Sequence, residues 1–320
     1  MTALTHFPQG FQSFLDAPRA ADLARIESDI AILGIPFGVP YKDDTYTYAA
    51  SSAGMARAVR RETNYNPGYL SHHDFDLGGP LLDGRDVRIV DCGDVPHDPT
   101  DVQGSSRRAT AAARKIVATG ALPIMIGGDD SVPIPFFRAF EGKGPLTIVQ
   151  IDSHIDWRND IAGITEGYSS TMRRASEMPW FTRMVQIGQR GVGDARAHGS
   201  RLIGAREVHG RGVPWVLDQI EGDRFLVTID CDGLDPSVIP AVNAPNPGGL
   251  SFHQTTDILH GLAAKGRIVG FDIVELAPAR DRDGISAMTV ARIVLNLIGA
   301  VARTGQFVGR AGTQPTQSQL

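Results

Sequence analysis

The sequence predicts an α/β protein: a single-domain, three-layer αβα sandwich built around a mainly parallel sheet. Short apolar runs recur along the 320 residues, each ends in Gly, Pro or Asp, and helical patterns lie between several of them. The runs are unbroken rather than alternating, which is typical of strands covered on both faces. Strands that alternate with helices in this way favour one parallel sheet with helices on both sides.

The expected elements follow in order along the chain. Strands are expected at residues 31–36, 87–90, 122–127, 146–152, 184–188, 225–230 and 268–273. Helices are expected at residues 105–119 and 251–265, which both stop before a glycine, and at 287–303, which ends in a cation that suits a helix C-terminus. Because no repeat or linker separates two halves, residues 1–320 are interpreted as one domain. It has a loop-rich amino-terminal third and a polar tail from about residue 311.

Composition excludes several classes of function. A net charge of −5 gives no electrostatic reason for binding nucleic acid or an anionic membrane. Two cysteines cannot form a disulfide framework, so a reducing compartment fits. Residues 1–10 lack the basic start and apolar core of a signal peptide, and the most apolar stretch, 293–302, is too short to cross a bilayer. We therefore expect a cytoplasmic protein without nucleic-acid or membrane partners.

Three of the expected strands lead into acidic clusters, at residues 127–131 (GGDDS), 152–156 (DSHID) and 230–236 (DCDGLDP). The carboxyl ends of parallel strands line the ligand crevice of an α/β sheet, so these clusters are expected to meet. Crowded carboxylates repel one another and raise each other's pKa. A divalent cation removes that cost, and oxygen ligands with one imidazole suit Mn, Fe or Ni.

The second cluster has the spacing of a ligand set. Asp152, His154 and Asp156 alternate along the chain, so in an extended segment their side chains point the same way and converge. A lone aspartate at a strand end is more often a helix cap or turn former, and GGDDS alone fits a tight turn. Two further acidic motifs in the same register of one sheet favour a metal site over that structural role.

At this point the chain resembles the ureohydrolase family, which includes arginase, agmatinase and guanidinobutyrase. The resemblance is carried by the three acidic clusters and by residues 34–37 (GIPF), 91–95 (DCGDV) and 271–278 (FDIVELAP), in this order. Residues 172–175 (MRRA) and 274–275 (VE) make the agmatinase-like branch the closer match. The resemblance implies an arginase-like fold and an amidinohydrolase that releases urea from a guanidino compound such as agmatine or guanidinobutyrate.

The resemblance also implies a binuclear centre of two divalent metals, with Mn²⁺ expected first and Ni²⁺ as the alternative. Asp152 and Asp230 would bridge the metals, His154 and Asp232 would complete one shell, and Asp156 would bind the other metal. In the family a bridging hydroxide attacks the guanidinium carbon. Two cations are needed because they lower the pKa of the bridging water and generate the nucleophile at neutral pH.

The expected catalytic residues are Asp156, Glu275 and Glu166, of which Glu275 would pair with the substrate guanidinium. Two departures from the family stand out. Asp130 occupies the position of a histidine metal ligand, which adds a negative charge and predicts weaker occupancy or a different metal preference. The family's proton-transfer histidine is replaced by Glu166 or, under a second alignment, by Tyr168.

The substrate is expected to be a small guanidino molecule, and the resemblance implies a homo-oligomer, either a trimer or a hexamer. A guanidino acid would need a cation such as Arg57, Arg60 or Arg190, whereas agmatine would need Asp43 or Asp44. The alternative hypothesis is a weak or inactive paralogue that serves as partner subunit of a heteromeric ureohydrolase. Metal content of the isolated chain separates the two hypotheses.

Overall fold

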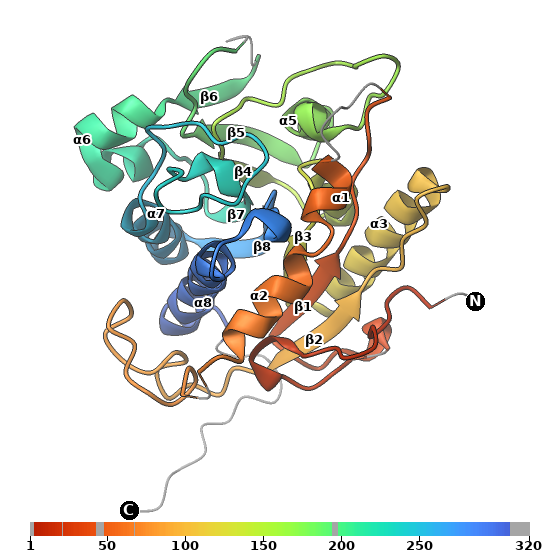
Figure 1. Cartoon of the computed structure of the whole chain (residues 1–320). Helices are drawn as coiled ribbons and strands as arrows, with labels where there is room; N and C mark the ends of the chain where they lie inside the picture. The colour runs from red at the N-terminus through yellow and green to blue at the C-terminus, as the bar shows by residue number, and fades with distance from the viewer. Residues whose placement is uncertain (1–2, 21, 43–47, 67, 194–197, 308–320) are drawn as a thin grey trace, which may run out of the picture.

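The computed structural model describes residues 3–20, 22–42, 48–66, 68–193 and 198–307, so the predicted polar tail lies outside the described residues. Eight strands form one sheet in the order β2-β1-β3-β8-β7-β4-β5-β6, and every neighbouring pair is parallel (Figure 1). Their bounds are β1 Ile30–Ile35, β2 Ile89–Asp94, β3 Leu122–Gly127, β4 Leu146–Ile151, β5 Phe181–Ile187, β6 Ser200–Ile203, β7 Arg224–Asp230 and β8 Arg267–Val274. The predicted α/β class and the parallel sheet are confirmed.

The α-helices are α1 Tyr48–Ser52, α2 Met55–Thr63, α3 Val102–Thr119, α4 Pro133–Phe137, α5 Thr171–Ala175, α6 Ala205–Asp218, α7 Phe252–Lys265 and α8 Ile285–Arg303. Short 3-10 helices occur at Phe14–Asp16, Leu23–Arg25, Arg138–Phe140, Tyr168–Ser170, Cys231–Gly233 and Pro278–Arg280. For each of the three predicted helices, the predicted first residue lies within three residues of the observed one, and the predicted last residue is the observed last residue.

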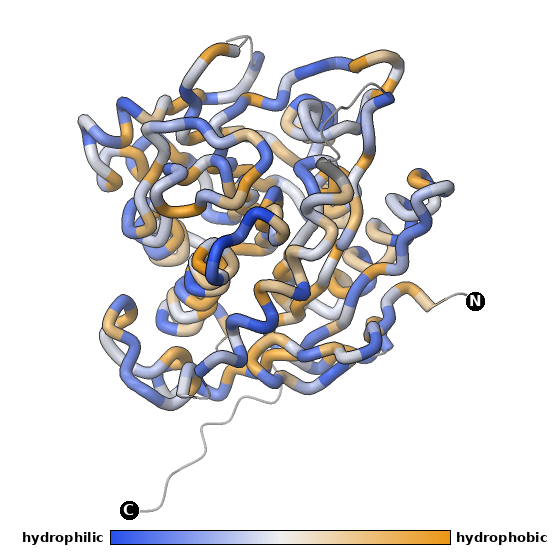
Figure 2. Tube along the Cα trace, viewed as in Figure 1, coloured by the Kyte–Doolittle hydropathy of each residue, from blue (hydrophilic) through white to orange (hydrophobic). Residues whose placement is uncertain are grey.

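Two helix layers cover the two faces of the sheet. Helices α2, α6, α7 and α8 share a core with strand residues such as Ile124 and Phe271, whereas α3, α4 and α5 pack with Met125 and Leu226. Adjacent residues of a strand point to opposite faces, and here both faces are buried. Figure 2 shows apolar residues concentrated along the chain in the middle of the molecule, where the strands lie. This double cover explains the unbroken apolar runs of the sequence.

Helix α8 is longer than the apolar stretch that the sequence suggested. Within the described part of the chain it is the one helix with the length and composition to cross a membrane, and 83% of its apolar window is buried inside the protein. The apolar stretch is therefore longer than the ten residues predicted at 293–302, and its length alone does not exclude a membrane span. Packing of α8 against α2, α7 and β8 accounts for its composition.

Strand β2 continues four residues beyond its predicted end because a buried arginine accommodates its acidic residues. Arg60 Nε donates to Asp91 Oδ2 at 2.8 Å, and Arg60 Nη1 donates to Asp94 Oδ1 at 2.6 Å. All three side chains are at most 9% exposed. Because Arg60 comes from α2, this partnership is not visible in the local pattern of β2.

Strand β6 and helices α1, α2, α4, α5 and α6 were not predicted, and two of these elements have a local reason. Edge strand β6 carries a half-exposed face and so lacks an unbroken apolar run. Helix α6 contains Pro214 and a non-helical Gly212 with φ 78°, which interrupt its pattern.

The sheet order determines where the acidic clusters meet. Strands β3, β8, β7 and β4 are consecutive neighbours in the middle of the sheet. Their registers pair Ile126 with Ile273, Val274 with Asp230, and Ile229 with Ile151, so the four strands end at nearly the same level. The segments that follow them therefore leave the sheet side by side.

Candidate metal centre

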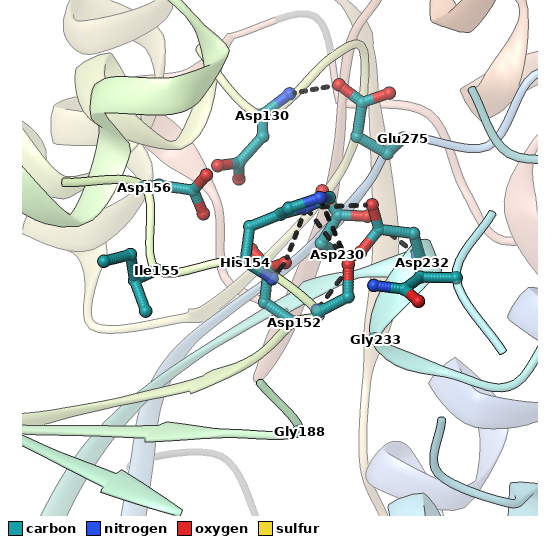
Figure 3. Close-up of polar contacts among 12 residues, drawn as sticks. Asp130, Asp152, His154, Ile155, Asp156, Gly188, Asp230, Asp232, Gly233 and Glu275 are labelled. Atoms are coloured by element: carbon teal, nitrogen blue, oxygen red, sulfur yellow. Dashed lines mark hydrogen bonds and ion pairs between the residues drawn. The ribbon is translucent and has the colours of Figure 1, made fainter. Parts of the chain in front are cut away.

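The four central strands deliver all the predicted ligands to one place (Figure 3). The segment after β3 supplies Asp130, the end of β7 and the turn after it supply Asp230 and Asp232, and Glu275 follows β8 directly. The segment after β4 supplies Asp152, His154 and Asp156. All of these residues except Asp152 line a cavity of about 700 Å³.

The side chains form two overlapping triads of donors. In each triad, one ligand atom per residue lies within 4.8 Å of the others; the triads are Asp152, His154 and Asp232, and Asp130, Asp152 and Asp156. The triads share Asp152, which lies between them. The carboxylate residues are buried, whereas the His154 side chain is 45% exposed toward the cavity.

Local hydrogen bonds hold the donors in these positions. Asp152 Oδ1 accepts from the His154 backbone N–H at 2.6 Å, and Asp230 Oδ1 accepts from the Asp232 backbone N–H at 2.8 Å. Asp156 and Glu275 adopt left-handed backbone conformations, with φ 44° and 68°. Non-glycine residues in this region are strained, and such strain clusters at functional sites.

Electrostatics make the cluster unfavourable without a counter-charge. Burial raises the pKa of Asp130, Asp152 and Asp230 well above its usual range, and the negative charges of neighbouring carboxylates raise it further. The carboxyl groups of Asp152 and Asp156 are also hydrogen-bonded to each other.

His154 and Asp232 compensate each other. Burial alone lowers the pKa of His154, but the hydrogen bond and charge of Asp232 outweigh burial and raise it to about 10. Burial raises the pKa of Asp232, but the hydrogen bond and charge of His154 bring it below its usual value. His154 Nδ1 lies 3.2 Å from Asp232 Oδ2, and the Ser153 hydroxyl donates to Asp232 Oδ1 at 2.8 Å.

Asp130 provides the clearest test of whether this cluster suits a cation. Both of its carboxylate oxygens are buried and accept no hydrogen bond from the described residues. Its backbone is fixed, since its N–H donates to Glu275 Oε1 at 2.9 Å and its carbonyl accepts from the Thr171 hydroxyl. A buried carboxylate without donors is costly, and a divalent cation is the partner that oxygen ligands with one imidazole fit.

Glu275 is held at both oxygens. While Oε1 accepts from the backbone of Asp130, Oε2 accepts from Asn243 Nδ2 at 3.1 Å. Asn243 is oriented in turn by the Ser51 hydroxyl, which donates to Asn243 Oδ1 at 2.9 Å. Burial, reinforced by the charge of Asp129, raises the pKa of Glu275 to about 8. Asn243 also lines the cavity, and nothing in its local sequence marks it.

Two buried glutamines, on neighbouring strands of the sheet, orient the ligands through hydrogen bonds. Gln150 Nε2 donates to Asp152 Oδ2 at 2.6 Å and to Asp156 Oδ2 at 2.8 Å. Gln186 Nε2, on the neighbouring strand, donates to Gln150 Oε1 at 2.6 Å. Sequence reasoning missed this pair, although a glutamine inside each of two apolar strands was a usable signal.

The structure does not bring Glu166 to the cluster. Its carboxylate accepts two hydrogen bonds from Arg138, at 3.1 and 2.5 Å, and it does not line the cavity. Tyr168 does line the cavity, and its ring contacts the ring of Tyr41. Of the two alternatives for the missing histidine, Tyr168 is therefore the one that faces the site.

The arginines that the sequence suggested as partners of a substrate carboxylate either lie outside the cavity or are hydrogen-bonded to other groups of the protein. Arg60 is bound to the aspartates of β2, and the guanidinium of Arg190 donates to backbone carbonyls around residues 232–234 and 246. Arg57 lines a second cavity, beside residues 8–12. Asp43 and Asp44 lie outside the described residues.

Comparison with known proteins agrees with this geometry. The sequence profile of the arginase family matches residues 28–299. A guanidinopropionase of Pseudomonas aeruginosa is 30% identical over 309 residues, which cover 92% of this chain and 93% of that protein. An agmatinase of Cronobacter sakazakii is 30% identical over 280 residues, covering 85% and 87%. The structure of proclavaminate amidino hydrolase from Streptomyces clavuligerus superposes with a TM-score of 0.79 at 26% identity, covering 95% of this chain and all of that one.

Proposed function

The chain belongs to the arginase family, and from this membership we propose that it hydrolyses a small guanidino compound to urea and an amine in a metal-dependent reaction. The observation that carries the proposal is the pair of donor triads that share Asp152 at the carboxyl edge of the sheet. The relatives at 30% identity, a guanidinopropionase and an agmatinase, support a guanidino substrate.

We propose that each triad holds one divalent cation, with Asp152 shared between them. Asp130 and Asp156 would then hold one cation, and His154 and Asp232 would hold the other. Asp230 is in neither triad, but it lies among the same carboxylates and would complete the ligand set. This division is supported by the grouping of ligand atoms and by the unpartnered oxygens of Asp130. When bound, two such cations lower the pKa of a water molecule enough to supply a nucleophile at neutral pH.

Glu275 is proposed to bind the substrate guanidinium. Its two oxygens are fixed by the Asp130 N–H and by Asn243, and it lines the same cavity as the triads. A planar guanidinium pairs well with a carboxylate held in one orientation, and the pairing places the central carbon beside the ligand cluster. The positive charge of the substrate also opposes the net negative charge of the site. Five ligand carboxylates with two divalent cations leave one negative charge.

Tyr168, rather than Glu166, is proposed as the side chain that contacts the leaving amine, because it lines the cavity while Glu166 is bound to Arg138. A phenol is a weak acid near neutral pH, so Tyr168 is proposed to position the amine by hydrogen bonding. Replacement of Tyr168 by Phe tests this role through the rate of urea release.

The experiment that tests the proposed function combines elemental analysis with a urea assay. Protein produced with manganese and, separately, with nickel is analysed for metal per chain and assayed with agmatine and guanidinobutyrate. Two metals per chain together with urea formation support the proposal, and we expect manganese to fill the site. Less than one metal per chain and no urea would overturn it in favour of a partner subunit without activity of its own.

A further inference from the structure

The cavity that contains the acidic cluster carries charge of opposite sign at its two ends. The acidic residues that line it in the described part of the chain are all members of the cluster or Glu275, and they are buried. The cavity is also lined by Arg158, Arg173 and His198, which lie nearer to solvent. The inner end is therefore anionic, and the mouth is cationic.

The two arginines retain capacity to bind an anion. The Arg158 side chain forms no hydrogen bond or ion pair with the described residues, although its backbone N–H is bound to Ser169. Arg173 Nε donates to Glu177 at 3.2 Å, and its terminal nitrogens have no partner within the described chain. Glu177 is shared with Arg174, so the group of arginines around it keeps a net positive charge.

Arg190 lines the same cavity, but its guanidinium is fully engaged by the protein, so it serves as a comparison for Arg158 and Arg173. Its guanidinium is engaged by backbone carbonyls, including those of Asp232 at 2.5 Å and Asn246 at 2.7 Å. Burial lowers the pKa of Arg190, an effect opposed by the charge of Asp232. Arg158 and Arg173 have no comparable set of acceptors, which distinguishes the mouth from the inner wall.

We propose that Arg158 and Arg173 form a carboxylate subsite, so that the substrate is a guanidino acid rather than a guanidino amine. The inference rests on the proposed function, because it assumes that the guanidinium enters the anionic end. A zwitterion then places each charge against its opposite, and the arginine fork suits a carboxylate. The ammonium group of agmatine would instead lie against two guanidinium groups.

Direct binding and turnover are measured with three four-carbon guanidinium ligands: guanidinobutyrate, whose far end is a carboxylate, agmatine, whose far end is an ammonium group, and butylguanidine, whose far end has no charge. Calorimetry gives the Kd of each ligand, and the urea assay gives kcat/KM. Two solvent-exposed charge pairs predict that guanidinobutyrate binds about tenfold more tightly than agmatine, with butylguanidine between them. Because exposed charges are screened over about 8 Å at physiological salt, this preference should shrink as salt is added.

The variants Arg158→Gln and Arg173→Gln remove the proposed partners and keep similar side-chain volume. We expect each to weaken guanidinobutyrate binding roughly threefold while leaving butylguanidine binding unchanged. Arg114→Gln is the matched control, since Arg114 is an exposed arginine on α3 that pairs with Glu141 and does not line the cavity. Arg114→Gln should change neither the Kd of guanidinobutyrate nor the Kd of butylguanidine.

The outcomes separate the inference from the proposed function. Tighter binding of guanidinobutyrate without urea supports the carboxylate subsite and overturns the hydrolase. Urea release with agmatine bound as tightly or more tightly supports the hydrolase and overturns the subsite. If none of the three ligands binds, both the carboxylate subsite and the proposed hydrolase function are overturned. Equal effects of Arg158→Gln, Arg173→Gln and Arg114→Gln would also overturn the assignment of these residues.

Discussion

Replacing Asp130 with Asn should have opposite effects on the metal-free and the metal-loaded protein. Asp130 is 3% exposed, and its carboxylate oxygens accept no hydrogen bond from the described residues. The charges of the neighbouring carboxylates repel a charge at this position. Asparagine removes that charge at almost the same volume, and its amide N–H can donate to a neighbouring carboxylate, a hydrogen bond worth about 1–3 kcal/mol, so the metal-free variant should be more stable than the parent protein.

The size of the shift follows from chain length. At roughly 2.1 cal/mol/K per residue, 320 residues have an unfolding entropy of about 0.67 kcal/mol/K, so 1 kcal/mol corresponds to about 1.5 °C in Tm. The metal-free variant should therefore melt about 1.5–4.5 °C higher. A cation at one hundred times its Kd stabilises by about 2.7 kcal/mol. Loss of one of two sites should therefore remove about 4 °C of the metal-induced rise.

The assay is calorimetry of both proteins in chelator and in saturating manganese, with metal per chain measured on the same samples. Asp257→Asn, an exposed aspartate on α7, is the control and should leave both melting temperatures within about 1 °C. A metal-free Asp130→Asn protein that melts lower than the parent would refute the electrostatic reasoning. A variant that still binds two metals per chain would refute the placement of Asp130 in a metal site.

Three further variants test the surroundings of the site. Arg60→Met should lose about 3–5 kcal/mol of unfolding free energy, because it leaves the two aspartates of β2 buried without a counter-charge. Arg183→Met, which breaks only an exposed pair with Glu221, should lose at most about 1 kcal/mol in the same denaturant titration. Asn243→Ala should lower kcat/KM about 10- to 100-fold through loss of the hydrogen bond to Glu275; an unchanged kcat/KM at full metal content would contradict this role. Gln150→Leu should weaken metal binding about 10- to 100-fold in a titration of metal-free protein, and parental affinity would show that the amide does not orient the ligands.

The fold was predictable because its signals are local. Each central strand is a mostly apolar run, and helix ends are marked by Gly120 and by the capping box of Ser251 and Gln254. The wrong end of β2 has a different cause, because a distant residue changes the local rule there. The acidic residues of β2 lie inside the strand only because Arg60 reaches them from α2, and no periodicity in residues 87–94 contains that information.

The candidate ligands were predictable for a different physical reason. They lie within about five residues of a strand end, so the register of a parallel sheet suffices to bring Asp130, Asp152 and Asp230 together. Glu166 lies farther along the loop that follows β4, where spacing along the chain no longer fixes position in space. There the outcome depended on a competing partner, Arg138, which binds the Glu166 carboxylate and leaves Tyr168 facing the cavity.

The distinction between strand ends and loops also explains why the sequence indicates the chemistry of the site but not its choice of substrate. The inner end of the cavity is built by strand ends, so its charge could be read from three motifs. The mouth is built by loops. Of the cations considered from sequence, Arg60 and Arg190 are bound to structural acceptors, and Arg57 lines a different cavity. The available cations, Arg158 and Arg173, are recognisable only once the loop after β4 is folded against α5. Choice of substrate is therefore expected to vary among relatives that share the ligand cluster, because loops change more readily than the strands that hold it.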